Sequence, residues 1–322
     1  MPDIALLAPT VSGLVTLLLI VWMLRTRDRL PLDVPNDRSL HRLPVPRSGG
    51  MAIMAGIFAG FAILQTPLAV VLPAAALVVV SHFDDARGLP IPLRLGAQLA
   101  AAAAFAFSAF PTVALSLLVV LGILWMANLY NFMDGSDGLA GGMTVIGFAS
   151  LAVGAWMSGN DASLIECAIV AAAGAAFLLF NFPPARLFMG DAGSVPLGFL
   201  VAALSLSGWR DGDWPLWFPA AVFAPFIADA TVTLLKRAVA RERIWEAHNN
   251  HYYQRIVRMG WSHRRTALVE YALMLACGVT ALWALREPLY LQMAAILALV
   301  ALHAGLAVWV ERAWQVLRKQ SY

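Results

Sequence analysis

The chain has 322 residues, of which 61% are hydrophobic and 13% charged, and its mean hydropathy is +0.75. A soluble domain has about 45–50% apolar and about 25% charged residues, so this composition excludes an ordinary soluble protein. The net charge of +3 would also suit nucleic-acid binding, but basic residues are common in the cytoplasmic loops of membrane proteins. The composition therefore indicates a single polytopic membrane domain over residues 1–322, with the lipid bilayer and no nucleic acid as its partner.

Apolar stretches between charged or Gly/Pro-rich breaks predict an all-α fold with about eleven transmembrane helices. Such a helix needs about 20 apolar residues to cross the hydrocarbon core. The second and third candidates are short and close together, so a count of ten stays open. The first stretch has no early positive cluster and no cleavage site, so we expect a retained first span. The candidates are 4–24, 50–65, 68–82, 93–110, 112–130, 139–158, 163–181, 193–209, 215–236, 266–285 and 289–310.

The basic residues predict which loops face the cytoplasm. With a periplasmic N-terminus, the 22 Lys and Arg residues all fall on the inner side except Arg210 and Arg286. This asymmetry follows the positive-inside rule. An odd number of spans then places the C-terminus in the cytoplasm. The predicted cytoplasmic loops are about 25–49, 83–94, 131–138, 182–192 and 237–265.

The first two inner loops carry proline, glycine and carboxylate motifs. The segment from Pro44 to Gly50 is held extended by its prolines, and its two glycines can offer backbone N–H groups to an anion. A plain connector is the alternative. Asp84 and Asp85 end the third span. A carboxylate near the bilayer is costly unless it is paired, hydrated or bound to a cation, so we interpret the pair as functional, with a solvated helix end as the alternative.

A polar stripe leads into the third inner loop. Asn128, Asn131, Asp134 and Asp137 recur every three positions, so over two helical turns they share one face. A polar face between two membrane spans indicates a binding site, and a plain loop is the less favoured alternative.

The fourth inner loop contains Asn181, Arg186, Phe188 and Asp191. Asp191 directly precedes a predicted helix, where its side chain can act as an N-cap. Capping would explain Asp191 alone. It does not explain the amide, the arginine and the aromatic residues in the same short loop, so the pattern favours a ligand site.

The largest inner loop is basic and contains two histidines. His248 and His251 are three residues apart, and Arg255 follows one turn later, which suits a helix face that contacts phosphate. A juxtamembrane helix attracted to anionic lipid is the alternative. Asp229, in the ninth span, either pairs with the basic residues that follow it or lines the site.

Together these segments resemble the polyprenyl-phosphate N-acetylhexosamine-1-phosphate transferase family (MraY/WecA type). The first and last motifs favour the branch that starts O-antigen, capsule or teichoic-type polymers. The peptidoglycan branch usually has a histidine run where this chain has His248-Asn249-Asn250-His251. The motifs that carry the resemblance are Pro44-Val45-Pro46-Arg47-Ser48-Gly49-Gly50, Asp84-Asp85, Asn128-x-x-Asn131-x-x-Asp134-Gly135-x-Asp137-Gly138-Leu139-Ala140, Phe188-Met189-Gly190-Asp191-x-Gly193-Ser194 and His251-x-Tyr253-Gln254-Arg255.

The resemblance implies a reaction in the bacterial inner membrane with an active site facing the cytoplasm. A sugar-1-phosphate would pass from a UDP-N-acetylhexosamine to undecaprenyl phosphate, with release of UMP. The cofactor would be Mg²⁺, for which Mn²⁺ can substitute. A homodimer is compatible with the sequence, which identifies neither the sugar nor the choice between direct attack and an aspartyl-phosphate. Phospho-N-acetylmuramoyl-pentapeptide transfer in peptidoglycan synthesis is the alternative within the family.

The resemblance also implies roles for individual residues. Asp191 would ligate the metal with help from Asn181. Asp84 and Asp85 would act near the lipid phosphate, one of them as a base, and His251 would contact the diphosphate. The remaining substrate-binding residues implied in this way are Asn128, Asn131, Asp134, Asp137, Asn181, Phe188, His248, Arg255 and Arg47.

Two other classes of membrane protein fit these motifs less well. The CDP-alcohol phosphatidyltransferases need Ala-Arg soon after an Asp-Gly pair, whereas here apolar sequence follows Gly138-Leu139-Ala140. An ion-coupled transporter would place its carboxylates near the middle of the bilayer, often in repeated halves. The predicted carboxylates lie at one membrane edge and the sequence has no repeat, so both classes are disfavoured.

Overall fold

The computed structural model describes residues 3–26, 30–35, 40, 43–243 and 248–320. Parts of the predicted inner loops 25–49 and 237–265 therefore lie outside the described residues. The helices are α1 (Ala8–Arg25), α2 (Gly49–Leu64), α3 (Leu68–Arg87), α4 (Ile91–Ala109), α5 (Val113–Phe132), α6 (Leu139–Ser158), α7 (Asp161–Asn181), α8 (Asp191–Asp211), α9 (Trp217–Val222), α10 (Ala224–Val239), α11 (Tyr252–Arg258), α12 (His263–Ala284) and α13 (Leu289–Gln320).

The predicted all-α membrane fold is confirmed in its coarse form. Within the described ranges, nine helices are long and apolar enough to cross a membrane, and α2 is a shorter apolar helix. A 3₁₀ helix (Asp3–Leu7) precedes α1, and the short strands β1 (Leu32–Asp33) and β2 (Val45–Pro46) form an antiparallel pair. The count of eleven spans and the orientation stay predictions.

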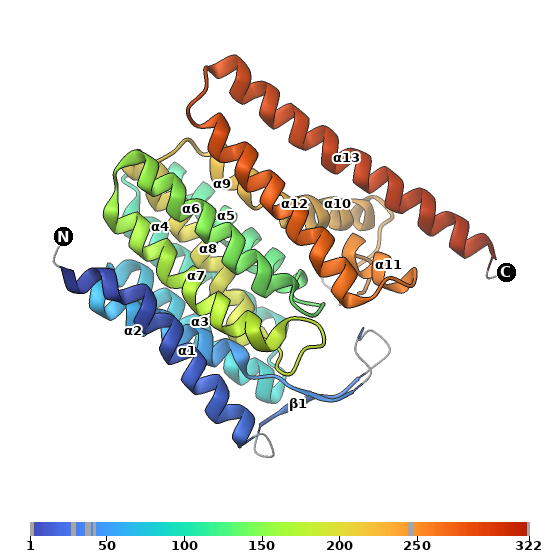
Figure 1. Cartoon of the computed structure of the whole chain (residues 1–322), viewed down its shortest axis with the longest axis horizontal. Helices are drawn as coiled ribbons and strands as arrows, with labels where there is room; N and C mark the ends of the chain where they lie inside the picture. Colours follow the sequence, from blue (N-terminus) through green and yellow to red (C-terminus); the bar gives the residue numbers. More distant parts are fainter. Residues whose placement is uncertain (1–2, 27–29, 36–39, 41–42, 244–247, 321–322) are drawn as a thin grey trace.

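The predicted span 215–236 is broken into α9 and α10. Helix α9 ends at Val222, and Pro225 lies in the first turn of α10. Proline has no backbone N–H to continue the hydrogen bonding of a preceding helix, but it fits the first turn of a new one. The break therefore lets α10 take its own direction between the bundle and α13 (Figure 1).

Helix α8 is the centre of the bundle and α13 is at its edge. The apolar window of α8 is 83% buried, against 17% for α13. Helices α2, α3 and α5 pack on α8, while α6, α7 and α1 form a neighbouring layer. Helix α13 runs along the outside of α12, with its main contacts on α10, α11 and α12 (Figure 1). The N-terminus of α8 is thereby enclosed by other helices.

Two glycines bring the N-termini of α2 and α8 together. The backbone N–H of Gly50 donates to Met189 O at 2.8 Å. A Cβ atom on Gly50 would lie 2.2 Å from the backbone nitrogen of Gly193. Only a residue without a side chain permits Gly50 and Gly193 to lie this close. Their contact holds the chain before α2 beside the chain before α8.

Gly50→Ala tests this contact. The added methyl group must push α2 from α8, and overpacking of this kind costs about 1–3 kcal/mol. We expect the variant in detergent to have a lower thermal unfolding temperature, which size-exclusion chromatography with fluorescence detection measures. Gly122→Ala, where no atom lies within 4 Å of the new Cβ, is the control and should be neutral or stabilising, because alanine is the better helix former. Equal unfolding temperatures for both variants would contradict the packing.

Candidate active site

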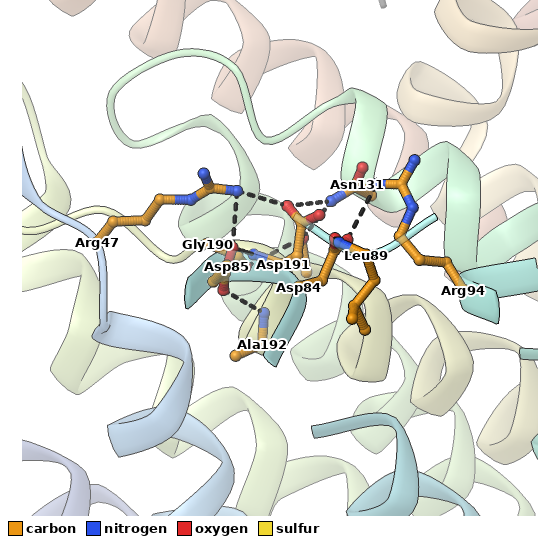
Figure 2. A network of polar contacts seen from close by, with 10 residues as sticks. Arg47, Asp84, Asp85, Leu89, Arg94, Asn131, Gly190, Asp191 and Ala192 are labelled. Atoms are coloured by element: carbon orange, nitrogen blue, oxygen red, sulfur yellow. Dashed lines mark hydrogen bonds and ion pairs between the residues drawn. The ribbon is translucent and has the colours of Figure 1, made fainter. Parts of the chain in front are cut away.

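The predicted motifs meet where α3 and α5 end and α2 and α8 begin. Figure 2 shows Arg47, Asp84, Asp85, Asn131 and Asp191 in one polar network. The segment before α2 lies beside the loop before α8, since Phe188 N donates to Pro46 O and Gly49 N donates to Phe188 O. Four separate stretches of sequence therefore supply this network.

Asp85 holds the N-terminus of α8. Its two carboxylate oxygens accept hydrogen bonds from the backbone N–H groups of Asp191 (3.1 Å) and Ala192 (3.0 Å), and Oδ1 lies 2.7 Å from Nη2 of Arg47. Gly190 precedes the helix with φ of 74°, and a Cβ there would lie 2.9 Å from Asp85 Oδ2. A charged acceptor at a helix N-terminus satisfies donors that have no partner within the helix.

Asp191 projects from α8 into the network. Its Oδ1 accepts hydrogen bonds from Arg47 Nη2 at 2.9 Å and from Asn131 Nδ2 at 3.0 Å, and Asn131 Nδ2 also contacts Ser194 Oγ at 2.9 Å. The N-cap position is Gly190, with no side-chain cap bond. The alternative that Asp191 is present to cap its own helix is therefore wrong.

Asp84 points to a different partner from Asp85. Its Oδ1 accepts from Leu89 N at 2.7 Å and its Oδ2 lies 3.0 Å from Nη1 of Arg94, and its side chain is 8% exposed. The alternative of a solvated helix end is wrong for both aspartates. No local sequence pattern predicts that Arg94 reaches Asp84.

Asp134 faces this network from the turn after α5. Burial raises the pKa of its carboxyl well above the usual range, and the neighbouring negative charges of Asp191 and Asp85 raise it further, while Arg47 opposes them. A nearby cation would favour the charged form and so act against these effects. Asp134 thus has the electrostatic surroundings of a group that would respond to a bound cation.

Asp137 and Asn181 join the turn after α5 to the loop before α8. Asp137 Oδ2 accepts from Ala185 N at 3.0 Å. The amide of Asn181 accepts from Gly138 N at 2.9 Å and donates to Leu187 O at 3.0 Å. Both polar atoms of Asn181 are therefore bonded to the backbone, which differs from the expected role as a metal ligand.

Asp229 and His251 form a second group at the N-terminus of α11. Asp229 accepts hydrogen bonds from Tyr252 N (2.9 Å) and Tyr253 N (3.0 Å), and its Oδ1 lies 3.2 Å from His251 Nδ1. His251 stacks on His248 with ring centroids 4.8 Å apart. Asp229 thus contacts His251 and the first two N–H groups of α11 in place of the basic residues that follow it in α10.

His248 is the more exposed of the two stacked histidines. Burial, the neighbouring imidazole of His251 and the guanidinium of Arg237 lower its pKa to about 4. At neutral pH the His248 ring is therefore uncharged, so it can offer a hydrogen bond but no positive charge.

Arg255 lies away from these groups, contrary to the expectation for it. Its Nη1 donates to Glu311 Oε1 at 2.8 Å. The expectation treated positions 251 and 255 as one helical face. Helix α11 begins only at Tyr252, and His251 has an extended backbone with ψ of 151°, so the helical spacing does not apply. Gln254 faces the site in place of Arg255.

A cavity of about 700 Å³ connects most of these residues. One part is polar and contains Asp84, Arg94, Asn131, Asp191 and His251. Asn128 and Gln98, which are hydrogen-bonded at 2.7 Å, lie at its edge. The other part is apolar and is formed by residues of α3, α4, α5 and α10: Leu77, Val80, Ile91, Leu95, Leu121, Leu124, Trp125 and Leu234. The cavity thus suits a ligand with a charged head and a long apolar chain.

The carboxylates fit a cation site in charge but are not a complete set of ligands. No group of three or more His, Cys, Asp or Glu side chains is arranged to hold a metal in the part of the chain that the structure describes. Nη2 of Arg47 instead bridges Asp85 and Asp191 (Figure 2). A metal ion bound here would also supply a positive charge between these two carboxylates. Phosphate oxygens of a substrate would have to complete the coordination shell of the metal.

Asp229→Ala tests how α11 is held. Each buried N–H group that loses its acceptor costs about 1–3 kcal/mol, so the amides of Tyr252 and Tyr253 should exchange hydrogen at least about tenfold faster. Hydrogen–deuterium exchange with mass spectrometry measures this, and the N-terminus of α8 should keep its protection. Asp213→Ala, which removes a carboxylate bonded to Asn160, is the control. Unchanged protection of α11 in Asp229→Ala would contradict the assignment.

Comparisons with known proteins show which family this chain is similar to. The model of "Glycosyl transferase family 4" matches residues 67–208. A probable undecaprenyl-phosphate N-acetylglucosaminyl 1-phosphate transferase of Bacillus subtilis is 31% identical over 275 residues, covering 78% of this chain and 76% of the relative. Undecaprenyl-phosphate alpha-N-acetylglucosaminyl 1-phosphate transferase of Escherichia coli K12 is 27% identical over 322 residues, covering 89% and 85%.

A relative from the peptidoglycan branch matches over a shorter stretch. Phospho-N-acetylmuramoyl-pentapeptide-transferase of Staphylococcus carnosus is 31% identical over 168 residues, which is 51% of each chain. With motifs, fold and relatives in agreement, this chain belongs to glycosyl transferase family 4, the polyprenyl-phosphate N-acetylhexosamine-1-phosphate transferases.

Proposed function

We propose that this protein transfers N-acetylhexosamine 1-phosphate from a UDP-sugar to undecaprenyl phosphate, releases UMP and so starts a cell-surface polysaccharide. One observation carries the proposal: Asp191, Asp84 and Arg94 line the polar part of a cavity whose other walls are apolar. A lipid phosphate needs a charged end and an apolar channel together. The names of the Bacillus subtilis and Escherichia coli relatives support the same reaction.

The lipid phosphate is placed at Arg94, with its chain along α4 and α5. Arg94 is held by Asp84 and can attract the phosphate to the cavity. Both oxygens of Asp84 and of Asp85 accept hydrogen bonds, which favours direct attack over a phosphorylated aspartate. A lipid phosphate oxygen then bonds to the sugar-bearing phosphorus, and the bond from this phosphorus to the bridging oxygen breaks as UMP leaves.

The nucleotide is placed between the turn after α5 and the loop before α8. Asp137 and Asn181 join these two loops and would so shape the uridine side. Phe188, in the loop before α8, is the residue proposed to stack on uracil. His251, oriented by Asp229, is a donor for the diphosphate, and His248 and Arg47 lie beside it.

Magnesium is the proposed cofactor. Asp191 would hold it with Asp85 and Asp134 nearby, and Arg47 would turn from the carboxylates toward phosphate. Magnesium prefers few protein carboxylates together with substrate phosphates, and when bound it would neutralise charge on the transferring phosphoryl group. The raised pKa of Asp134 supports this, because a cation would favour its charged form.

The other candidate functions have less support. The peptidoglycan relative matches about half of the chain, and residues 248–251 lack a histidine run. A transporter would need its carboxylates near the middle of its helices, whereas Asp84, Asp85 and Asp191 lie at helix ends.

We also propose eleven spans, counting α2 and the α9–α10 pair, in the inner membrane with the site facing the cytoplasm. A homodimer is compatible with this arrangement.

The reaction is tested with purified protein, UDP-N-acetylglucosamine, undecaprenyl phosphate and Mg²⁺. We expect metal-dependent release of UMP, measured by chromatography, and a loss of about 10²–10³-fold in Asp191→Asn, because a group that stabilises transition-state charge is removed. Asp161→Asn, an exposed carboxylate at the start of α7, should keep full activity. Full activity of Asp191→Asn would overturn the assignment, and a panel of other UDP-sugars would identify the donor.

The orientation is tested by labelling introduced cysteines. The buried Cys167 and Cys277 are first replaced by alanine. Arg25→Cys, at the exposed end of α1, and Arg286→Cys, in the exposed turn between α12 and α13, are then introduced separately. A thiol reagent that cannot cross membranes should label position 286 in intact spheroplasts. Position 25 should become labelled only after permeabilisation. Labelling of both positions from the same side would contradict the proposed topology.

A further inference from the structure

A second cavity, of about 680 Å³, lies between α10, α12 and α13. Its lining is mostly apolar and includes Val232, Ile256, Leu273, Leu299 and Ala307. Helix α13, which forms its outer wall, is mostly exposed on the outside of the bundle. In a membrane such a cavity faces lipid. It is separate from the first cavity, which lies on the other side of α10 and α11.

A cluster of positive charges lies at the α11 end of this cavity. Lys236 and Arg255 share one carboxylate, Glu311, at 2.6 and 2.8 Å. Arg258 and Arg318 lie over the ring of Trp314 at 4.8 and 5.8 Å. Over the described residues, neither of these two arginines has a carboxylate within ion-pair distance.

The arginines of this cluster repel one another. Burial, Arg318 and Arg255 together lower the pKa of Arg258, and Nε of Arg255 is buried without a hydrogen-bond partner in the described chain. Among the described residues, these four cations share one carboxylate, Glu311, which leaves an excess of three positive charges. Such an excess at a membrane edge is stabilised by an anion, because the charge on each arginine persists at any physiological pH.

The charges and the cavity meet at Tyr252. Its ring lines the cavity and lies 5.2 Å from Lys236 Nζ and 5.6 Å from Arg255 Cζ. Ile256 and Val310, which line the same cavity, pack with Tyr252 in one small cluster. A molecule with an anionic head at the arginines can therefore extend an apolar chain directly into the cavity.

We propose that this protein binds one anionic glycerophospholipid, with its phosphate at Arg258 and Arg318 and an acyl chain in the cavity between α10, α12 and α13. The bilayer supplies this ligand from the side on which α13 is exposed. Arg258 donates hydrogen bonds only to the neutral Asn249 among the described residues. The charge excess therefore selects an anionic headgroup over a zwitterionic one, since a phosphodiester without a compensating amine complements guanidinium groups that have no carboxylate partner. Asp229 and Glu270 line this cavity, but Asp84, Asp85, Asp134 and Asp191 are not among its lining residues, so the ligand is distinct from the acceptor lipid.

Native mass spectrometry of the full chain in detergent tests the proposal, with equal amounts of phosphatidylglycerol and phosphatidylcholine added. We expect one phosphatidylglycerol per chain, retained at least about tenfold more than phosphatidylcholine. Arg258→Gln combined with Arg318→Gln should remove the preference. Arg25→Gln combined with Arg286→Gln, which removes the same charge at exposed positions elsewhere, should keep it.

A second pair of variants tests the cavity without changing charge. Ala307→Phe fills space that Ala307 lines and should reduce retention at least about tenfold, whereas Ala301→Phe, on an exposed part of α13, should not. Inorganic phosphate in excess should not displace the lipid. Equal retention of the two lipids, retention by the arginine variant, displacement by phosphate, or preferential replacement by undecaprenyl phosphate would each overturn the proposal. UMP release is measured separately, so failure here leaves the proposed reaction standing.

Discussion

The hydrogen bonds from the N-terminus of α8 to Asp85 are the interaction on which the site depends. Helix α8 is the most buried of the membrane-spanning helices, and its first N–H groups have no partner within the helix. Asp85, at the end of α3, accepts from two of them. The same contact sets where α8 begins, and so places Asp191 between Arg47 and Asn131.

The N-terminus of α11 is held in the same way. Asp229 of α10 accepts from the first two N–H groups of α11 and contacts His251 just before it. In both cases a carboxylate from a neighbouring helix satisfies a helix terminus that would otherwise leave polar groups unpaired near the bilayer. An unpaired polar group in such surroundings is expensive. Stability and placement of the reactive side chain therefore rest on the same bonds.

The balance of charge differs between the two cavities. Around Asp191 the carboxylates outnumber the nearby arginines, so the first cavity suits a cation and phosphates that arrive together. Around Trp314 the arginines outnumber the carboxylates, so an anion alone suits the second. Helices α10 and α11 separate the two: Leu234 and Gln254 line the first cavity, and Val232 and Ile256 line the second. This division lets one membrane domain treat two phosphate-bearing lipids differently.

The sequence by itself determined the membrane class, the helices and the segments that form the site. These are local properties, since an apolar stretch must close its own hydrogen bonds as a helix in lipid, and a carboxylate at its end needs a partner. Only the tertiary structure decided the partners. Asp85 caps α8 in place of Asp191, Asn181 bonds two loops, and Arg255 turns to Glu311. Each of these bonds joins residues on different elements, and their distance and direction depend on how the helices pack, which no local pattern encodes.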